Sequence, residues 1–226
     1  MFWIALAAVV SAPLPTNLHD WFGQRDTPAY VTQRGRGPWT VGVRVTVRPD
    51  GSIQGCQIES ASGIPDLDGL TCRLILDRAK FKPAKWIDGS SVLGIYRTFV
   101  EWGVSDPFGN RLELSSADLD VLVQGLPSNI HSPALVRTMF AVDALGQISS
   151  CTAEPGPALV QIDQDPALVS VACDQLVRSY RAKPARDSSG SSIPSVQDAQ
   201  VRFSIDRADR ARETRHKPET VIIPRT

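Results

Sequence analysis

The sequence of 226 residues has few of the residues and motifs that mark common catalytic sites. Its three histidines are scattered, with no HExxH motif and no cysteine at metal-site spacing. No GxSxG motif surrounds a serine, so the chain lacks a nucleophile elbow. Its 24 Lys and Arg balance 24 Asp and Glu, which leaves no excess positive charge to attract nucleic acid. We therefore expect a protein that is not an enzyme and that binds no metal, no cofactor and no nucleic acid.

The sequence also has no uninterrupted run of about 20 apolar residues, the length that a membrane-spanning helix needs. The apolar run from Phe2 to Val10 is shorter and fits the core of a signal peptide, and Val10-Ser11-Ala12 resembles a cleavage site. Residues 1–12 are thus predicted to be a signal peptide, and the protein to be periplasmic or secreted. No Lys or Arg precedes the run, so two alternatives stay open: a buried N-terminal segment, or a start codon that clips a longer signal or membrane anchor.

One stretch has the pattern of a small α+β unit. From Val41 to Val47 every second residue is valine, the period of a strand with one buried face. Pro49-Asp50-Gly51 has turn chemistry and Ile53 to Ile58 is again extended, which predicts an antiparallel hairpin. Apolar residues recur at helical spacing from Leu67 to Ala79, and Val92 to Trp102 is rich in β-branched and aromatic residues. The predicted order is β-β-α-β.

A related block recurs later in the chain. The matching positions, first copy before second, are Val47–Cys56 and Val142–Cys151, Cys72 and Cys173, and Phe81–Ala84 and Ala182–Ala185. Because the matches keep their order and much of their spacing, they predict two tandem β-β-α-β units, over residues 38–103 and 134–206. The fold class is therefore α+β, with one helix packed on a small antiparallel sheet in each unit.

All four cysteines lie inside the two copies, at the same place relative to the hairpin and the helix. Disulfides Cys56–Cys72 and Cys151–Cys173 would staple the second strand of each copy to its helix. Closing a loop of this size stabilises a small domain by about 3 kcal/mol. A zinc site needs close pairs such as CxxC, which these spacings do not supply, and free thiols are the other alternative. Disulfides would place the protein outside the cytoplasm.

Three further segments flank or join the copies. Residues 13–37 are irregular and polar, and the Trp21-Phe22 pair in them is predicted to pack on the first unit, with a contact to a partner as the alternative. In the connector (residues 104–133), the segment from Ser115 to Asp118 has capping residues and is followed by leucines at helical spacing. This pattern predicts a short capped helix. The charged tail, residues 207–226, ends in a β-prone peptide suited to adding to a sheet edge, in its own chain or in a neighbour.

Several motifs of the first copy, taken in order, resemble the C-terminal domain of TonB-type energy transducers. They are Pro49-Asp50-Gly51, Ser60-Ala61-Ser62-Gly63, Leu67-Asp68, Phe81-Lys82-Pro83-Ala84, Asp88-Gly89 and Val100-Glu101-Trp102. The resemblance covers residues 35–103 well and 134–206 more weakly, since the second copy has Ala144-Leu145 where the first has Pro49-Asp50. It implies a β-β-α-β core whose helix packs on a three-stranded sheet.

By this resemblance, an extended segment of a protein partner pairs with a sheet edge, which gives affinity through main-chain hydrogen bonds. The candidate edge is Ile95, Tyr96, Arg97, Thr98, Phe99, Val100, Glu101 and Trp102, with Val201 to Ile205 as its counterpart. The expected partner is an envelope protein such as an outer-membrane receptor or transporter, and a homodimer is a further expectation from the family. The alternatives are a small exported hydrolase or cell-wall accessory protein with a polar cleft between the units, and a purely structural scaffold.

Overall fold

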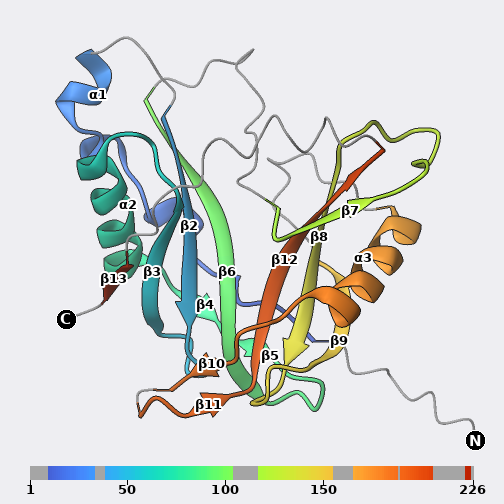
Figure 1. Ribbon diagram of the computed structural model, residues 1–226. Helices are drawn as coiled ribbons and strands as arrows, with labels where there is room; N and C mark the ends of the chain where they lie inside the picture. Colours follow the sequence, from blue (N-terminus) through green and yellow to red (C-terminus); the bar gives the residue numbers. More distant parts are fainter. Residues whose placement is uncertain are drawn as a thin grey trace, which may run out of the picture.

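The computed structural model describes residues 10–33, 39–103, 117–154, 165–187, 189–205 and 222–224. They form an α+β fold whose largest sheet has the strand order β13-β3-β2-β6-β12-β8-β9, with β5 and β7 paired beside this path (Figure 1). The predicted α+β class is therefore confirmed, but the two small antiparallel sheets that the sequence predicted are joined in one mixed sheet by the parallel pairing of β6 with β12. We call residues 39–102 the N-terminal unit and residues 134–204 the C-terminal unit.

The N-terminal unit contains the predicted β-β-α-β order. Its elements are β2 (Trp39–Val47), β3 (Ile53–Ser60), α2 (Pro65–Arg78), the short strands β4 (Phe81–Lys82) and β5 (Ala84–Lys85), and β6 (Ser91–Trp102). Strand β2 lies in the middle and pairs antiparallel with both β3 and β6. The alternating valines of β2 are fully buried in one cluster with apolar residues of α2, which is why the predicted strand period appears as an inward and an outward face.

The C-terminal unit repeats this order of elements. Its elements are β8 (Ala134–Val142), β9 (Ile148–Ala153), α3 (Pro166–Ser179), the short strands β10 (Ala185–Arg186) and β11 (Ser192–Ile193), and β12 (Ser195–Ser204). Helix α3 is capped by Asp165, whose carboxylate accepts the N–H groups of Ala167 and Leu168 at 2.9 and 3.2 Å. A second cluster of buried apolar residues joins α3 to β8 and β12.

One glycine in each hairpin makes the same close approach. Gly51 and Gly146 both have positive φ, at 84° and 85°. A Cβ on Gly51 would lie 2.5 Å from the carbonyl oxygen of Phe81, and one on Gly146 would lie 2.9 Å from that of Ala182. Because Phe81 and Ala182 also match in the sequence alignment of the two blocks, the turns have the same packing in both units.

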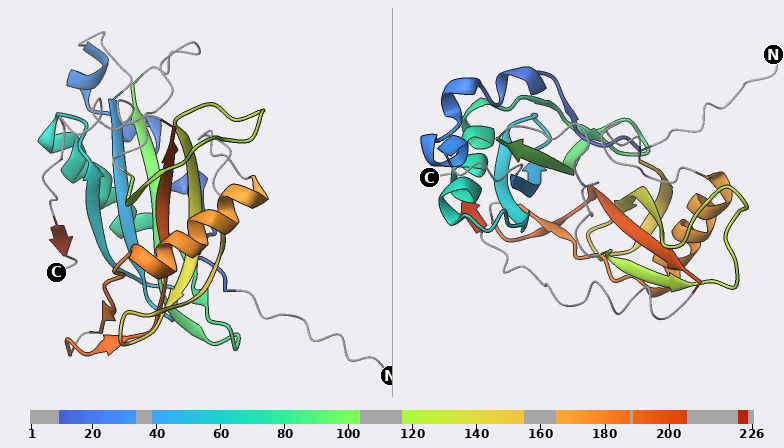
Figure 2. Two further views of the ribbon diagram at one scale, coloured as in Figure 1. Left: turned by 45° about the vertical axis from the view of Figure 1, so that its right-hand side comes forward. Right: turned by 90° about the horizontal axis from the view of Figure 1, so that it is seen from above.

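The two units meet along a narrow parallel pairing. Strands β6 and β12 pair only at Leu93 with Ser195 and at Gly94 with Val196 within the described ranges. Beyond this point the two strands diverge, and α2 and α3 lie on opposite sides of the molecule (Figures 1 and 2). The main-chain connection between the units is therefore local, and side chains must supply the rest.

An N-terminal strap runs over the N-terminal unit and across this junction. It comprises β1 (Leu14–Pro15), the 3-10 helices η1 (Leu18–Asp20) and η2 (Gln24–Asp26), and α1 (Ala29–Gln33). Trp21 is 1% exposed and packs in the N-terminal core, as predicted, where its ring contacts Phe81 and Tyr96.

The first described residues of the strap lie at the junction itself. Val10, which falls inside the predicted signal segment, is 1% exposed and packs among Ala84 of the N-terminal unit and Met139, Ala141 and Val196 of the C-terminal unit. Ser11 exchanges two backbone hydrogen bonds with Lys85, at 3.0 and 3.1 Å. The other residues of the segment 1–12 that precede Val10 lie outside the described residues.

The connector corrects one prediction. Residues Leu119–Leu122 form a strand, β7, and not the predicted helix. The leucines at 119, 122 and 126 have helical spacing, but Leu119, Val121 and Val123 also alternate, and this alternate set packs on the C-terminal core. Pairing with β12 satisfies the backbone of β7, so tertiary context overrides the local helical pattern.

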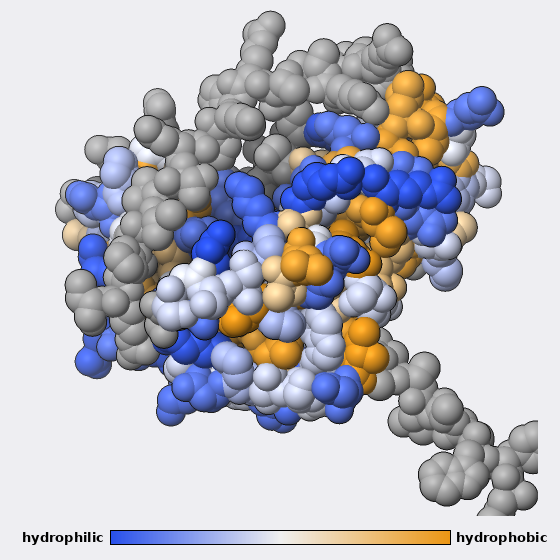
Figure 3. Space-filling model, turned by 60° about the horizontal axis from the view of Figure 1, so that its bottom comes forward, coloured by the Kyte–Doolittle hydropathy of each residue, from blue (hydrophilic) through white to orange (hydrophobic). Residues whose placement is uncertain are grey.

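The last described segment, β13 (Ile222–Pro224), pairs antiparallel with β3 at Gln57, Cys56 and Gly55. The tail thus adds to a sheet edge of its own chain, one of the two possibilities predicted for it. No helix in the described part of the chain is long and apolar enough to cross a membrane. The face near β10 and β11 is largely polar, with apolar groups in separate patches (Figure 3).

Candidate functional site

Each unit contains one disulfide, in the predicted pairing. Cys56 of β3 is bonded to Cys72 of α2, and Cys151 of β9 is bonded to Cys173 of α3, with a Cα–Cα distance of 5.6 Å in both. All four cysteines are used. Cys56 and Cys72 are fully buried, whereas Cys151 and Cys173 are partly exposed. Each bond fixes the helix of its unit to the second strand of the hairpin. Neither bond involves the closing strands, β6 and β12.

The predicted binding edge lies on β6, where β2 pairs along one side and the described strands pair with only a short part of the other side. Strand β2 pairs with β6 from Gly94 to Trp102. On the other side β12 reaches only Leu93 and Gly94, and no strand in the described ranges pairs with β6 above them. The main chain of Ile95–Val100 is therefore the part of the predicted edge on which a further strand could pair.

Most side chains of the predicted edge pack inward and are not available to a partner. Tyr96, Val100 and Trp102 belong to the N-terminal core. The indole N–H of Trp102 donates to Thr71 Oγ1 at 2.9 Å. Thr98 and Phe99 are half-buried and Glu101 is exposed. The edge residues thus form one continuous strand, and its main chain is more available to a partner than its side chains are.

The counterpart edge on β12 already carries a strand. Residues Val201–Ser204 pair in parallel with Leu119–Leu122 of β7. The pairing extends at both ends, because the N–H of Asp118 donates to the carbonyl of Gln200 and that of Val123 to the carbonyl of Ser204, both at 2.9 Å. The corresponding edges of the two units therefore differ: one holds a segment of its own chain, while the other holds no strand among the described residues.

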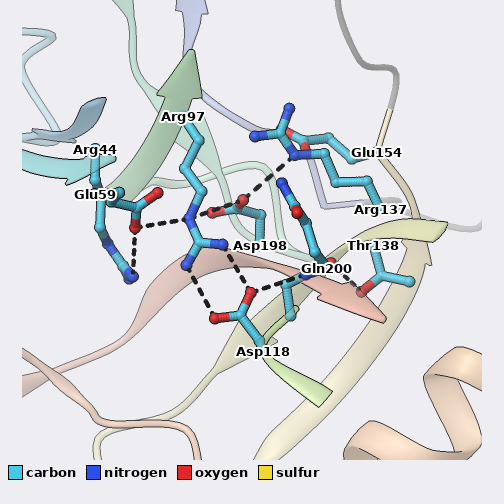
Figure 4. Close-up of polar contacts among 10 residues, drawn as sticks. Arg44, Glu59, Arg97, Asp118, Arg137, Thr138, Glu154, Asp198 and Gln200 are labelled. Carbon is cyan, nitrogen blue, oxygen red and sulfur yellow. Dashed lines mark hydrogen bonds and ion pairs between the residues drawn. The ribbon is translucent and has the colours of Figure 1, made fainter. Parts of the chain in front are cut away.

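A buried ion cluster fills the space where β6 and β12 diverge (Figure 4). Arg97 of β6 is at its centre, with a side chain only 8% exposed. Its Nη1 donates to Asp118 Oδ2 at 2.7 Å, and its Nε lies 3.2 Å from Glu59 Oε1 and 3.3 Å from Asp198 Oδ2. One arginine thus joins β3, the start of β7 and β12.

A second arginine extends the cluster into the C-terminal unit. Arg137 of β8, 2% exposed, lies 2.8 Å from Glu154 and 3.6 Å from Asp198. The cluster has three arginines, Arg44, Arg97 and Arg137, and four carboxyl groups, Glu59, Asp118, Glu154 and Asp198. Among these seven described groups, full ionisation would leave one more negative than positive charge, and burying ions is costly in a medium of low dielectric constant.

The cluster responds to this imbalance by retaining a proton. Burial raises the pKa of Glu154 to about 7, with the charge of Asp198 acting in the same direction and Arg137 and Arg97 opposing it. Burial also raises the pKa of Glu59. Burial disfavours the charged form of Arg97, but Asp198, Asp118 and Glu59 outweigh this and raise its pKa well above the ordinary value. The cluster is close to neutral when Glu154 is protonated.

Comparison with known families identifies the N-terminal unit. Residues 36–102 match the family model described as the Gram-negative bacterial TonB protein C-terminal. The N-terminal unit is a TonB C-terminal-like domain. No curated protein and no solved structure matches the chain.

The family match concerns the N-terminal unit alone. Its family comprises periplasmic protein-interaction domains that act without enzymatic chemistry and contact outer-membrane proteins. The matched residues end at Trp102, so they include the whole of β6 and exclude the C-terminal unit. Within the described residues, no group of three or more His, Cys, Asp or Glu side chains is arranged to hold a metal ion.

The sequence analysis did not single out the ion cluster as a site. A signal for it exists, because Arg44, Arg97 and Arg137 each stand inside an otherwise largely apolar strand. A charged residue on the second face of a central strand must find an opposite charge if that face is covered. The sequence does not show that the second faces of two units cover each other, so the pairing of these charges could not be deduced.

Proposed function

We propose that the protein is an exported interaction module whose TonB C-terminal-like domain binds an extended segment of an envelope partner by strand addition to β6. The observation that supports it most is the pairing of β7 on β12. We infer that the C-terminal unit is a diverged second copy, because it shares element order, disulfide position and turn packing with the first. The chain then already shows a peptide on the equivalent edge.

This comparison gives the expected geometry of binding. Strand β7 runs parallel to β12, so we expect the partner segment to run parallel to β6 along Ile95–Val100. Since Tyr96 and Val100 point into the core, recognition would rest on main-chain hydrogen bonds, with side chains of the partner adding specificity.

A periplasmic location and an outer-membrane receptor or transporter as partner are part of this proposal. They rest on the family of residues 36–102 and on the two disulfides, which persist in oxidising compartments. A homodimer formed through the same edge would also satisfy its main chain. No observation on the described residues favours the hydrolase or scaffold alternatives.

The test uses two neighbouring proline variants, Thr98→Pro and Phe99→Pro. Successive N–H groups of a strand point to opposite sides, so one variant removes a donor toward β2 and the other a donor toward the open side. The oxidised wild-type protein and both variants are used to capture partners from an envelope extract. We expect a specific envelope protein to bind the wild type and to be lost with the variant that alters the open side.

A second measurement keeps the result interpretable if a variant unfolds. Amide hydrogen exchange of the wild-type protein, with and without the captured partner, should show new protection within residues 95–100. Equal capture by both folded variants, or protection confined to other strands, would place the binding site elsewhere. Failure of the wild type to capture any envelope protein would reject the proposal.

A further inference from the structure

We propose that Val201–Ser204 of β12 is a second peptide-binding edge, and that β7 occupies it as an exchangeable resident strand. The partner that this edge fits is an extended peptide with two acidic residues separated by one apolar residue. The inference goes beyond the proposed function, because its edge lies on the C-terminal unit and β6 contributes the side chain of Arg97 but no main-chain pairing.

The main-chain contacts of β7 are those of strand addition. Its four residues pair with β12 and with no other strand in the described part of the chain. The pairing is parallel and joins positions 82 residues apart in sequence, as in Leu119 with Val201. A segment attached along one side only, through a short ladder, resembles a bound peptide more than an internal strand.

Two arginines recognise the acidic side chains of this segment. Asp118 binds Arg97 of the N-terminal unit at 2.7 Å, and Asp120 binds Arg202 Nε at 2.6 Å. Both guanidinium groups are held in place, with side chains 8% and 6% exposed. Because residues two apart in a strand project to the same face, the acidic-apolar-acidic spacing matches the positions of the two arginines.

The apolar side chains of β7 use the opposite face. Leu119 and Val121 pack, partly buried, on the C-terminal core, while Leu122 is 44% exposed. The fully buried residues of that core come from β8, β12 and α3, and include Val136, Phe203 and Leu176. Strand β7 is thus a cover on a core that other elements build, and a peptide with the same alternation could replace it.

If β7 leaves the edge, the charge of Arg97 remains partly compensated. Arg97 would retain Glu59 and Asp198 as neighbours, at 3.2 and 3.3 Å. The edge would then present one arginine from each unit, aimed at the two positions that Asp118 and Asp120 now fill. Exchange of strands, unlike removal of a core element, therefore requires no rearrangement of β6 or β12.

The test supplies the resident segment as a separate peptide. An acetylated and amidated peptide of residues 117–123, Ala-Asp-Leu-Asp-Val-Leu-Val, is fluorescently labelled and titrated with the full oxidised chain. Wild-type protein is compared with the double variant Asp118→Asn, Asp120→Asn, in which the resident strand loses its ion pairs while β12 is unchanged. We expect the variant to bind the peptide at least about tenfold more tightly than the wild type does, because the competing strand is weakened.

Three controls decide between this inference and a nonspecific peptide surface. A peptide with both aspartates changed to asparagine, and the double variant with Arg202→Gln added, should each bind about tenfold or more weakly. Amide hydrogen exchange should show protection by the parent peptide at Val201–Ser204. If the folded double variant binds both peptides equally, or binds neither, the inference is wrong. Neither outcome bears on strand addition to β6, because the proline variants and hydrogen exchange at residues 95–100 test that edge separately.

Discussion

At the scale of single residues, the most unusual feature is the placement of full charges inside central strands. Arg137 and Asp198 are each 2% exposed at the side chain, where desolvation of an ion is costly. Buried ion pairs contribute little net stability compared with apolar residues of the same size, but a mispaired alternative leaves a charge uncompensated. The cluster therefore favours one arrangement of the two units over others, because only that arrangement brings Arg97 to Asp118 and Asp198.

The first prediction concerns Glu154 and pH. Its pKa is about 7 in the folded protein and near the ordinary 4.5 in the unfolded chain. Between these values the folded protein binds a proton that the unfolded chain has lost, so the free energy of unfolding falls as pH rises. The slope for one such group is at most about 1.4 kcal/mol per pH unit. Glu154→Gln should show a shallower slope, measured by urea unfolding at pH 5, 6, 7 and 8.

A matched control separates this effect from general charge effects. Asp50 is an exposed turn residue whose pKa is lowered by hydrogen bonds from Ser52, so it titrates below this window. Asp50→Asn should therefore leave the slope between pH 5 and 8 unchanged, whatever it does to overall stability. A slope equal to that of the wild type in Glu154→Gln would contradict the prediction.

At the scale of the elements, the two disulfides make the same link between a strand and a helix, but their cysteines differ in solvent exposure. Their sequence separations of 16 and 22 residues give similar loop entropies, and each bond should stabilise its unit by about 3 kcal/mol. Cys56 and Cys72 are 0% exposed, whereas Cys151 and Cys173 are partly exposed. A reductant can reach the second bond without opening a core.

We therefore predict that Cys151–Cys173 is reduced before Cys56–Cys72. The native protein is treated with a mild reductant, quenched at intervals with an alkylating agent, and digested for mass spectrometry. The earliest modified peptides should contain Cys151 and Cys173. Equal rates at both bonds would instead show that reduction follows global unfolding, and a faster reaction at Cys56 would reverse the order that burial predicts.

The elements also show how far local pattern determines this fold. The hairpins, both helices and both closing strands follow from features within a few residues, such as the valine alternation of Val41–Val47 or the Asp165 cap. Strand β7 does not, because the same leucines fit a helix and a strand, and only the edge of β12 decides between them. The ion cluster could not be predicted from the sequence for the same reason, because the pairing of Arg97 with Asp118 and Asp198 depends on how the units meet.

At the scale of the whole molecule, the described residues join the two units through several small contacts, among them the following three. The main chain provides two paired positions on β6 and β12, and the ion cluster bridges the region where these strands diverge. The N-terminal strap provides the third contact. Pro13 crosses Gly94 so closely that a Cβ there would lie 2.5 Å from its ring, and Val10 is inserted between Ala84 and the C-terminal unit.

The last prediction is that Val10–Ala12 holds the two units together. Burying a valine contributes about 1.5–3 kcal/mol, and Ser11 adds two backbone hydrogen bonds to Lys85. A chain beginning at Pro13 should therefore unfold at a lower temperature than one beginning at Ala8, and Val10→Asp should reproduce the loss. Leu14→Asp, at a strap position that is 58% exposed, is the matched control and should change stability little.

The outcome bears directly on where the chain is processed. Cleavage after Ala12 would remove Val10, so a protein exported by that route would rely on the ion cluster and two paired positions to join its units. Equal melting temperatures for the two chains would show that these contacts suffice and would contradict the role given to the strap. A large difference would mean that cleavage at this position loosens the junction, and with it the geometry in which Arg97 faces Asp118.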